Sequence, residues 1–271
     1  MPDTETTISE EAITQAATRL ATAAKTGVAC APINDLIGPS DIGVAYRVQQ
    51  QLIDWQIEDG AVVVGRKIGA TSLAVQTQLG VDQPDFGVLF ADMDVSDLPE
   101  VPTERMLQPK AEAEVAFRLG ADLAEGDLDL DQIRAAVTGA VAALELVDSR
   151  IENWKILITD TVADNASSGL YVLGDNWVSL DEFEPKDVVM KMYADDELVS
   201  EGNGEACLGD PLIALQWLAR TAREYGEPLR AGQVVLSGAL GPMVPAAPGV
   251  TIRAELSTLG TVTAVFSRKE S

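Results

Sequence analysis

The stretch Pro109-Lys-Ala-Glu-Ala-Glu-Val-Ala-Phe117 decides the fold of this chain. Apolar and polar residues alternate from Ala111 to Val115, with the period of two that is typical of a β-strand. On such a strand Glu112 and Glu114 point to the same face, with their Cα atoms roughly 7 Å apart. The segment therefore predicts a strand that presents two carboxylates on one side.

A third glutamate, Glu145, lies between two leucines in the apolar run from Val141 to Val147. An ionised side chain is costly there unless something neutralises it. Three carboxylates brought together repel one another, so they either take up protons or surround a cation. Because the ligands are oxygen atoms and the chain has no histidine, we expect Mg²⁺ or Mn²⁺ rather than zinc, copper or haem. For Glu112 and Glu114 alone, a solvated strand face is the alternative.

The composition limits the classes of partner. The chain has 271 residues, enough to bury a substantial core. Its 43 acidic and 19 basic residues give a net charge of −24, which disfavours nucleic acid and anionic membrane surfaces as partners. Much of the acidic charge lies away from the three glutamates, so it indicates a solvated surface and identifies no ligand.

Two cysteines, Cys30 and Cys207, are too few for a disulfide framework. Residues 1–11 are acidic, where a secretory signal would be basic and then apolar. No apolar run reaches the roughly 18 residues that a membrane helix needs. We therefore expect a soluble, cytoplasmic protein.

The first 60 residues are predicted to be helical. Ser9 caps a helix that extends to about Lys25. A second helix is predicted from Asp41 to Asp59, and it ends at Gly60. Beyond it the pattern changes to strands and loops, with a β-like segment at 61–69, a short helix at 72–79 and a short strand at 86–90.

The remainder of the chain predicts a large mixed sheet with few helices. Helices are expected near 129–137 and at 211–225, and an irregular segment at 153–169. Besides the glutamate strands, further strands are expected near 170–173, 187–194, 233–237, 250–256 and 261–266. This α+β pattern lacks the regular strand–helix alternation of a doubly wound sheet. The run Gly65-Arg-Lys-Ile-Gly69 is not the glycine fingerprint of a dinucleotide site, so no nucleotide cofactor is expected.

The absence of histidine limits the available chemistry. Covalent catalysis by Ser167 or Ser237 is not expected, because such serines usually rely on histidine as their base. Proton transfer then falls to a lysine or a carboxylate with a shifted pKa. The candidates are Lys67, in a glycine-bounded β segment, and Asp85, in the turn Gln83-Pro-Asp-Phe-Gly87. The plain alternatives are a surface lysine and a turn-forming aspartate.

Seven motifs follow one another in a fixed order between Gly65 and Val244, within a resemblance that extends from about Pro32 to Phe266. They are GRKIGATS from residue 65, QLGVDQPDFGVLFADM from 78, PKAEAE from 109, ALELVDSRI from 143, DTVADNASSG from 160, CLGDPL from 207 and LSGALGPMV from 236. Together they resemble the 2-keto-4-pentenoate hydratases of aromatic ring-cleavage pathways. The resemblance covers nearly the whole chain.

This resemblance implies the fumarylacetoacetase-like fold, an α+β fold whose core is a rolled mixed β-sheet. Residues 1–60 would form an N-terminal helical segment packed on that core, and residues 61–271 the catalytic domain. It also implies a homo-oligomer, and an association with the aldolase that acts downstream is a further hypothesis.

The resemblance also assigns roles to single residues. It implies a divalent metal cation, Mg²⁺ or Mn²⁺, with a ligand set of Glu112, Glu114 and Glu145. Lys67 and Asp85 would be the catalytic residues near the metal. Asn165, Ser167 and Ser237 lie in matching polar motifs and are candidates for binding the substrate carboxylate, although loop residues of these types more often cap or tie the backbone.

The implied reaction is the hydration of 2-hydroxypenta-2,4-dienoate (2-keto-4-pentenoate) to 4-hydroxy-2-oxopentanoate in aromatic meta-cleavage catabolism. A decarboxylase acting on 2-oxohex-3-enedioate (4-oxalocrotonate) is the main alternative, because a cation-stabilised enolate serves both reactions. A hydratase of larger dioic acids and an acylpyruvate hydrolase also remain open. The alternative without catalytic activity is an acidic scaffold subunit whose glutamates hold a structural ion.

Overall fold

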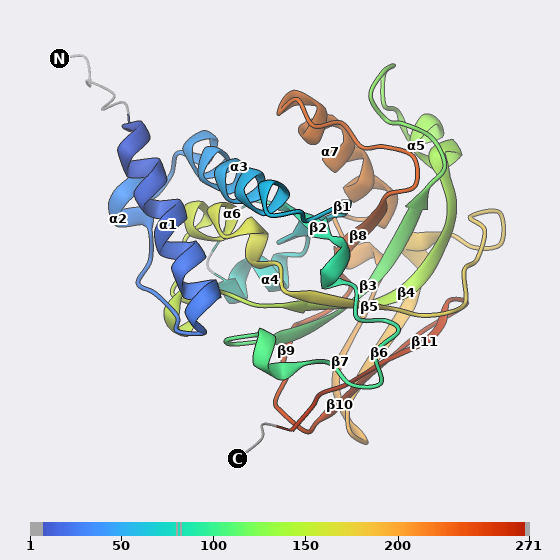
Figure 1. Cartoon of the computed structure of the whole chain (residues 1–271). Helices are drawn as coiled ribbons and strands as arrows, with labels where there is room; N and C mark the ends of the chain where they lie inside the picture. Colours follow the sequence, from blue (N-terminus) through green and yellow to red (C-terminus); the bar gives the residue numbers. More distant parts are fainter. Residues whose placement is uncertain (1–7, 80, 82, 269–271) are drawn as a thin grey trace.

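A curled, mixed β-sheet forms the centre of the molecule (Figure 1), which is a computed structural model that describes residues 8–79, 81 and 83–268. The acidic segment at residues 1–7 lies outside this described part. The sheet order is β2-β1-β8-β3-β4-β5, and β9 pairs with β3. The strands are β1 (Val63–Gly69), β2 (Asp85–Phe90), β3 (Lys110–Leu119), β4 (Val137–Val147), β5 (Leu170–Leu173), β8 (Val234–Ala239) and β9 (Val244–Pro245).

The pairing confirms the predicted mixed sheet. Strands β1 and β8 run parallel, whereas β1–β2, β8–β3, β3–β4 and β4–β5 are antiparallel. The odd-numbered residues of β3, such as Val115 and Phe117, join the main apolar core. The even-numbered residues, which include Glu112 and Glu114, therefore point to the opposite face. That alternation is the pattern that the sequence predicts.

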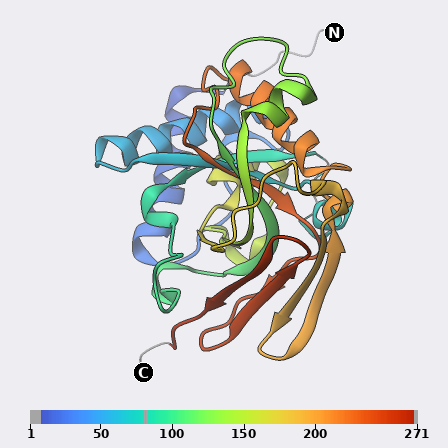
Figure 2. The ribbon, with the colours of Figure 1, turned by 90° about the vertical axis from the view of Figure 1, so that its right-hand side faces the viewer.

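A second, four-stranded antiparallel sheet lies against β4 of the first. Its order is β11-β10-β6-β7, with β6 (Val189–Ala194), β7 (Glu197–Asn203), β10 (Thr251–Leu256) and β11 (Gly260–Val265). Both of its hairpins are visible at the bottom of Figure 2. The sequence does not predict β7, because its apolar residues Leu198 and Val199 are adjacent and do not alternate with polar ones. Pairing with β6, which buries alternate residues such as Met190 and Met192, holds it in place.

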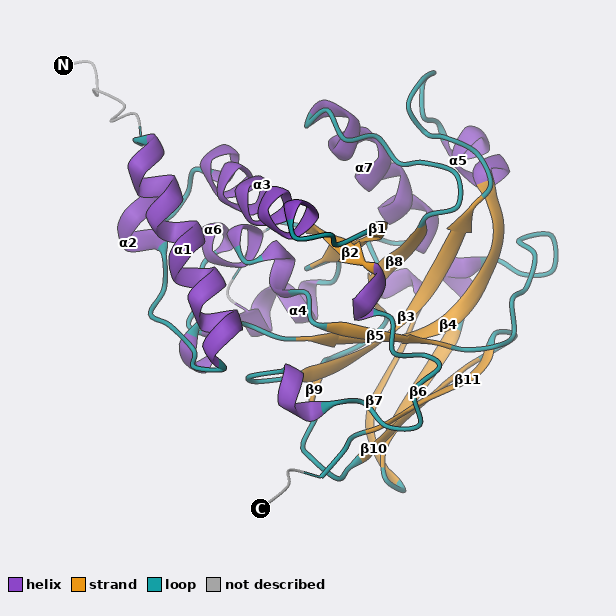
Figure 3. Ribbon diagram, in the orientation of Figure 1, coloured by secondary structure: helices purple, strands orange, loops and turns teal. Residues whose placement is uncertain are grey.

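Helices gather on one side of the curled sheet and at its upper edge (Figure 3). They are α1 (Glu10–Thr26), α2 (Asn34–Ile37), α3 (Ile42–Glu58), α4 (Leu73–Leu79), α5 (Leu130–Ala136), α6 (Ile158–Ala163) and α7 (Pro211–Glu224). The predicted cap at Ser9 is confirmed, because its side chain accepts a hydrogen bond from the backbone N–H of Ala12. Asp41 caps α3 in the same way, by accepting from the backbone N–H of Val44. None of the helices in the described ranges is long and apolar enough to cross a membrane.

The prediction of an irregular segment at 153–169 is wrong in part, because this segment contains α6. Asp160 explains the difference. Its carboxylate accepts hydrogen bonds from the backbone of Leu157, which begins α6, and of Ile33 and Asn34, which begin α2. Leu157 is three residues from Asp160, but Ile33 and Asn34 lie 127 and 126 residues away from it, so local patterns do not reveal these two partners.

The N-terminal helices and both sheets share one apolar core. Ile13 and Leu20 of α1, Val48 of α3, Phe117 of β3 and Ile252 of β10 belong to the same cluster of buried side chains. Gln49 of α3 strengthens this contact, since its amide donates to the backbone of β2 and α6. A division of the chain at residue 60 therefore stays a prediction.

Candidate active site

Five neighbouring strands of the curled sheet each bring a buried polar side chain to one region. In sheet order, the residues are Asp85 of β2, Lys67 of β1, Ser237 of β8, Glu112 and Glu114 of β3, and Glu145 of β4. Glu112 lies directly opposite Glu145 in the pairing of β3 with β4, and Asp85 lies opposite Gly69. None of the six is more than 4% exposed. Burial therefore rules out the solvated-face interpretation of the two glutamates of β3.

The three glutamates form a compact cluster of oxygen atoms. One carboxylate oxygen from each lies within 4.8 Å of the others. Glu114 Oε2 accepts a hydrogen bond of 2.7 Å from the backbone N–H of Gly238. The other oxygens in the cluster include buried atoms without a hydrogen-bond partner: Glu112 Oε1, Glu114 Oε1 and Glu145 Oε2. Buried polar atoms are normally satisfied, so these orphaned oxygens mark a place where a further group binds.

The carboxyl groups of the cluster resist ionisation in the absence of a cation. Burial, together with the charge of Glu145, raises the pKa of Glu112 to about 7. Burial and the other two glutamates raise the pKa of Glu114 well above its ordinary value. The pKa of Glu145 is raised as well, by burial. A positive ion among them would reverse these shifts, because it favours the charged forms.

Lys67 lies beside this cluster, with its Nζ 3.2 Å from Glu145 Oε1. Its ammonium also donates a hydrogen bond of 2.8 Å to the backbone oxygen of Ala166. Burial acts to lower the pKa of Lys67, yet the surrounding carboxylates of Glu145, Asp85, Glu112 and Glu114 outweigh it and raise the pKa above its ordinary value. The lysine is therefore a buried cation, and the surface alternative does not apply.

Asp85 lies on the other side of Lys67, at the start of β2. Thr161 of α6 donates a hydrogen bond of 3.1 Å to Asp85 Oδ2, and the hydroxyls of Thr161 and Ser167 are 3.2 Å apart. Burial raises the pKa of Asp85, although the positive charge of Lys67 opposes the shift. A buried lysine and a buried aspartate beside a carboxylate cluster are groups that can carry protons.

The three candidate substrate-binding residues differ in their surroundings. Ser237 is fully buried and its Oγ has no hydrogen-bond partner. Ser167 is 3% exposed and its Oγ contacts Thr161. Both ends of the Asn165 amide bind the backbone of Val88. Oδ1 accepts a hydrogen bond of 2.7 Å from the backbone N–H, and Nδ2 donates one of 2.9 Å to the backbone oxygen. Its side chain thus ties a turn to β2, which is the plainer role for such a residue.

Sequence reasoning misses several groups at the site. Thr161 lies in the DTVADNASSG motif, but its pattern does not distinguish it from an ordinary buried threonine. The backbone groups of Ala166 and Gly238 carry no side-chain signal. Position 238 requires glycine for two reasons. Its φ is 108°, and a Cβ there would lie 2.1 Å from Thr71 Oγ1.

The donor set fits a hard divalent cation. Three carboxylates supply only oxygen atoms, which Mg²⁺ and Mn²⁺ prefer. One oxygen of each glutamate lies within 4.8 Å of the others, each glutamate has a buried oxygen without a hydrogen-bond partner, and no nitrogen or sulfur ligand joins them among the described residues. The predicted glutamates thus come together in the kind of site that the sequence indicates.

Comparisons with known proteins place this architecture. The family model described as "Fumarylacetoacetate (FAA) hydrolase C-terminal" matches residues 81–267. A protein of Pseudomonas putida named "TodF product hydratase" is 50% identical over 257 residues, which covers 95% of this chain and 96% of the relative. "2-keto-4-pentenoate hydratase 1" of Dechloromonas aromatica is 50% identical over 252 residues, covering 93% of this chain and 96% of the relative.

One solved structure resembles the chain over almost its full length. It is 4-oxalocrotonate decarboxylase from Pseudomonas putida G7 complexed with magnesium and adipate, with a TM-score of 0.90 and 32% identity. The match covers 96% of this chain and 99% of that one. The predicted fold is therefore confirmed. The chain belongs to the 2-keto-4-pentenoate hydratase family, within the fumarylacetoacetate hydrolase fold family.

Proposed function

We propose that the protein is a metal-dependent hydro-lyase that converts 2-hydroxypenta-2,4-dienoate and water into 4-hydroxy-2-oxopentanoate. The single observation that carries the proposal is the cluster of three buried glutamates, each of which has a carboxylate oxygen without a hydrogen-bond partner. The two hydratases that are 50% identical over most of their length support the choice of substrate class.

Glu112, Glu114 and Glu145 would hold Mg²⁺ or Mn²⁺. When bound, such a cation binds the oxygens of a 2-oxo or 2-hydroxy acid and stabilises negative charge on them. The magnesium and adipate bound to the decarboxylase from Pseudomonas putida G7 support this proposal. Gly238 contributes by fixing one oxygen of Glu114, which leaves the other oxygen free to act as a ligand.

The reaction needs proton transfers at two stages. The 2-hydroxyl proton must leave and carbon 5 must gain one, which gives 2-oxopent-3-enoate. Water then adds its hydroxyl to carbon 4, and carbon 3 takes up a proton. We assign these transfers to Lys67 and Asp85, the buried titratable groups beside the glutamate cluster that are not part of it. One would act on the enol oxygen and the other would activate the water.

The surroundings of these two residues suit proton transfer. Both side chains are 2% exposed, so bulk water is kept away from the groups. We assign the binding of the substrate carboxylate to Ser237 and Ser167, and the unpartnered hydroxyl of Ser237 makes it the stronger candidate. Asn165 would act indirectly, by holding the turn that carries Ser167.

An ultraviolet assay tests this proposal. Adding the dienoate to the enzyme with Mg²⁺ or Mn²⁺ should bleach the conjugated chromophore, and a chelator should stop the reaction. Loss of carbon dioxide from 2-oxohex-3-enedioate, without hydration of the dienoate, would instead identify a decarboxylase. Absence of any spectral change with either substrate would favour the acidic scaffold.

Assembly and location are part of the same proposal. We infer a homo-oligomer in the cytoplasm, with the downstream aldolase as a candidate partner. The sequence resemblance supports the oligomer, and the net charge of −24 gives no reason to expect nucleic acid as a partner. Light scattering of the purified protein, alone and with the aldolase, tests both forms of association.

A further inference from the structure

The turn Asp164–Ser168 holds Lys67 and Asp85 at the same time. Residues 165–167 all have positive φ, between 51° and 53°, which is unfavourable for residues other than glycine. This backbone turns the oxygen of Ala166 toward Lys67, which donates to it at 2.8 Å. The same turn places Ser167 Oγ next to Thr161, which donates to Asp85. The turn therefore contacts Lys67 directly and reaches Asp85 through Thr161.

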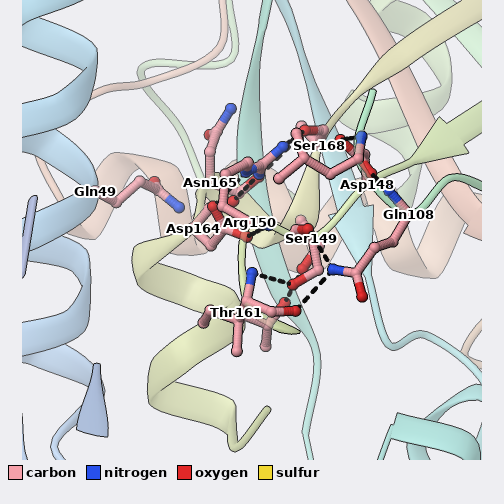
Figure 4. A network of polar contacts seen from close by, with 12 residues as sticks. Gln49, Gln108, Asp148, Ser149, Arg150, Thr161, Asp164, Asn165 and Ser168 are labelled. Carbon is pink, nitrogen blue, oxygen red and sulfur yellow. Dashed lines mark hydrogen bonds and ion pairs between the residues drawn. The ribbon is translucent and has the colours of Figure 1, made fainter. Parts of the chain in front are cut away.

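The network in Figure 4 explains how this strained turn is maintained. Arg150 donates to Asp164 Oδ1 at 2.5 Å, to the backbone oxygen of Asp164 at 2.7 Å and to that of Ser168 at 2.6 Å. It thus joins the two ends of the turn. Asn165 fixes the middle by its paired hydrogen bonds with Val88 of β2. The surrounding structure over-determines the conformation, as strained sites require.

Thr161 is the side chain that connects this turn to Asp85. Its hydroxyl carries one proton, which it donates to Asp85 Oδ2. Ser167 must then be the donor in its contact with Thr161, so the chain runs from Ser167 through Thr161 to Asp85. Rotation of the Asp85 carboxylate would break this chain and leave buried groups without partners.

We propose that Thr161 is a positioning residue, which fixes the Asp85 carboxylate in its working orientation through the chain Ser167–Thr161–Asp85. The effect of Thr161 on catalysis rests on the proposed function, whereas its effect on the orientation of the Asp85 carboxylate does not. In this role Thr161 acts through Asp85, to whose Oδ2 it donates. Small displacements of a group that transfers protons cost rate because the reacting atoms lose their alignment.

The test compares three variants at α6. Thr161→Val keeps the shape but removes the hydroxyl, and we expect kcat to fall about 10- to 100-fold with KM changed by less than about threefold. Thr161→Ser keeps the hydroxyl and should restore kcat to within about threefold of the wild type. Thr159→Val is the matched control, because Thr159 is also fully buried and donates to a backbone oxygen, that of Gly38 at 3.0 Å, away from the site.

A double-mutant cycle with Asp85→Asn separates positioning from general loss of structure. If Thr161 acts through Asp85, adding Thr161→Val to Asp85→Asn should lower kcat by less than about threefold more. An additive loss, full activity of Thr161→Val, or an equal loss in Thr159→Val would each overturn the proposal. Thr161→Ala, with a smaller side chain, replaces the valine variant if that one does not fold.

A crystal structure of Thr161→Val supplies a readout that does not depend on the reaction. The proposal predicts that the Asp85 carboxylate rotates away from its wild-type position, while Lys67 and the glutamates stay in place. An unchanged carboxylate would overturn it. If the wild type fails to bleach the dienoate but Asp85 rotates in the variant, the proposed function is wrong and the positioning role stands.

Discussion

At the scale of single residues, the site depends on carboxylates that are buried where apolar residues would be expected. Glu145 lies on β4 among neighbours that are all buried, and it is itself 1% exposed. Burying three such groups without a cation is unfavourable, which is why the pKa values of Glu112 and Glu114 rise. The cluster therefore lowers the stability of the metal-free protein, and it provides the ligands for a cation.

Two substitutions should separate metal binding from proton transfer. Glu114→Gln keeps the side-chain volume but removes a charged ligand, so Mn²⁺ binding should weaken by at least about 10-fold and turnover should fall with it. Lys67→Ala should leave Mn²⁺ bound and lower kcat by about 100-fold or more. Titration calorimetry and the ultraviolet assay measure the two effects. Glu197→Gln, on an exposed part of β7, is the control.

The opposite outcome would contradict these assignments. Unchanged metal-dependent turnover in Glu114→Gln would exclude this glutamate as a ligand. Loss of Mn²⁺ binding in Lys67→Ala would show that the lysine maintains the cluster and would leave its role in proton transfer unsupported.

Metal binding should depend on pH in a defined direction. The folded-state pKa of Glu112 is raised from 4.5 to about 7, so the metal-free folded protein holds a proton there that the unfolded chain has lost. The contribution of Glu112 to the stability of the metal-free protein is therefore greatest below pH 4.5, and it falls as the pH rises to about 7. A cation must displace that proton, so its affinity rises over the same range.

Thermal unfolding with and without Mn²⁺ checks this dependence. The increase in Tm caused by the metal should be larger at pH 8 than at pH 6. An equal increase at both values would mean that Glu112 is already ionised without the cation.

At the scale of elements, β1 and β2 place Lys67 and Asp85 by close approach of the backbone. An added Cβ at Gly69 would lie 2.1 Å from Asp85 Oδ1 and 3.2 Å from Lys67 Nζ. Gly69→Ala should therefore displace Asp85 and lower kcat by about 10-fold or more. It should also lower Tm. In Gly43→Ala, at the start of α3, the added Cβ has only an ordinary contact with Asp41 at 3.4 Å.

Activity and thermal unfolding of these two variants form a matched comparison. Gly43→Ala should retain activity and stability, since alanine is the better helix former. If Gly69→Ala were as active as the wild type, Asp85 would not need the position that the structure gives it.

The elements also show how far sequence reasoning reaches. The helices α1 and α3 and the alternating strand around Glu112 are predicted correctly, because the cap at Ser9 and the periodicity of apolar residues are local signals. The helix α6 and the strand β7 are missed. The first depends on distant partners of Asp160, and the second on pairing with β6. The predicted site residues come together, whereas Thr161 and the backbone groups of Ala166 and Gly238 become visible only in three dimensions.

At the scale of the whole molecule, the N-terminal helices are part of the structure that supports the site. Tyr46 of α3 stacks on Phe86 with ring centroids 4.6 Å apart, and Phe86 directly follows Asp85. Gln49 donates to the backbone oxygens of Phe86 and Val162, which links β2 to α6. Removal of these helices would expose the apolar surface that they cover.

A chain that begins at residue 61 should therefore fail to fold cooperatively. Near-ultraviolet circular dichroism and thermal unfolding test this, with the full chain as the control. A cooperative transition in the shortened chain would show that residues 61–271 form an independent domain and that the helices are an addition to it.

The central claim is that a divalent cation binds between the glutamates of β3 and β4. Crystals of the protein soaked in Mn²⁺ and measured near the manganese absorption edge test it most directly. We predict one strong anomalous peak in contact with the carboxylates of Glu112, Glu114 and Glu145. Contradiction would be a fully ordered site without an anomalous peak there, with the three carboxyl groups hydrogen-bonded to one another.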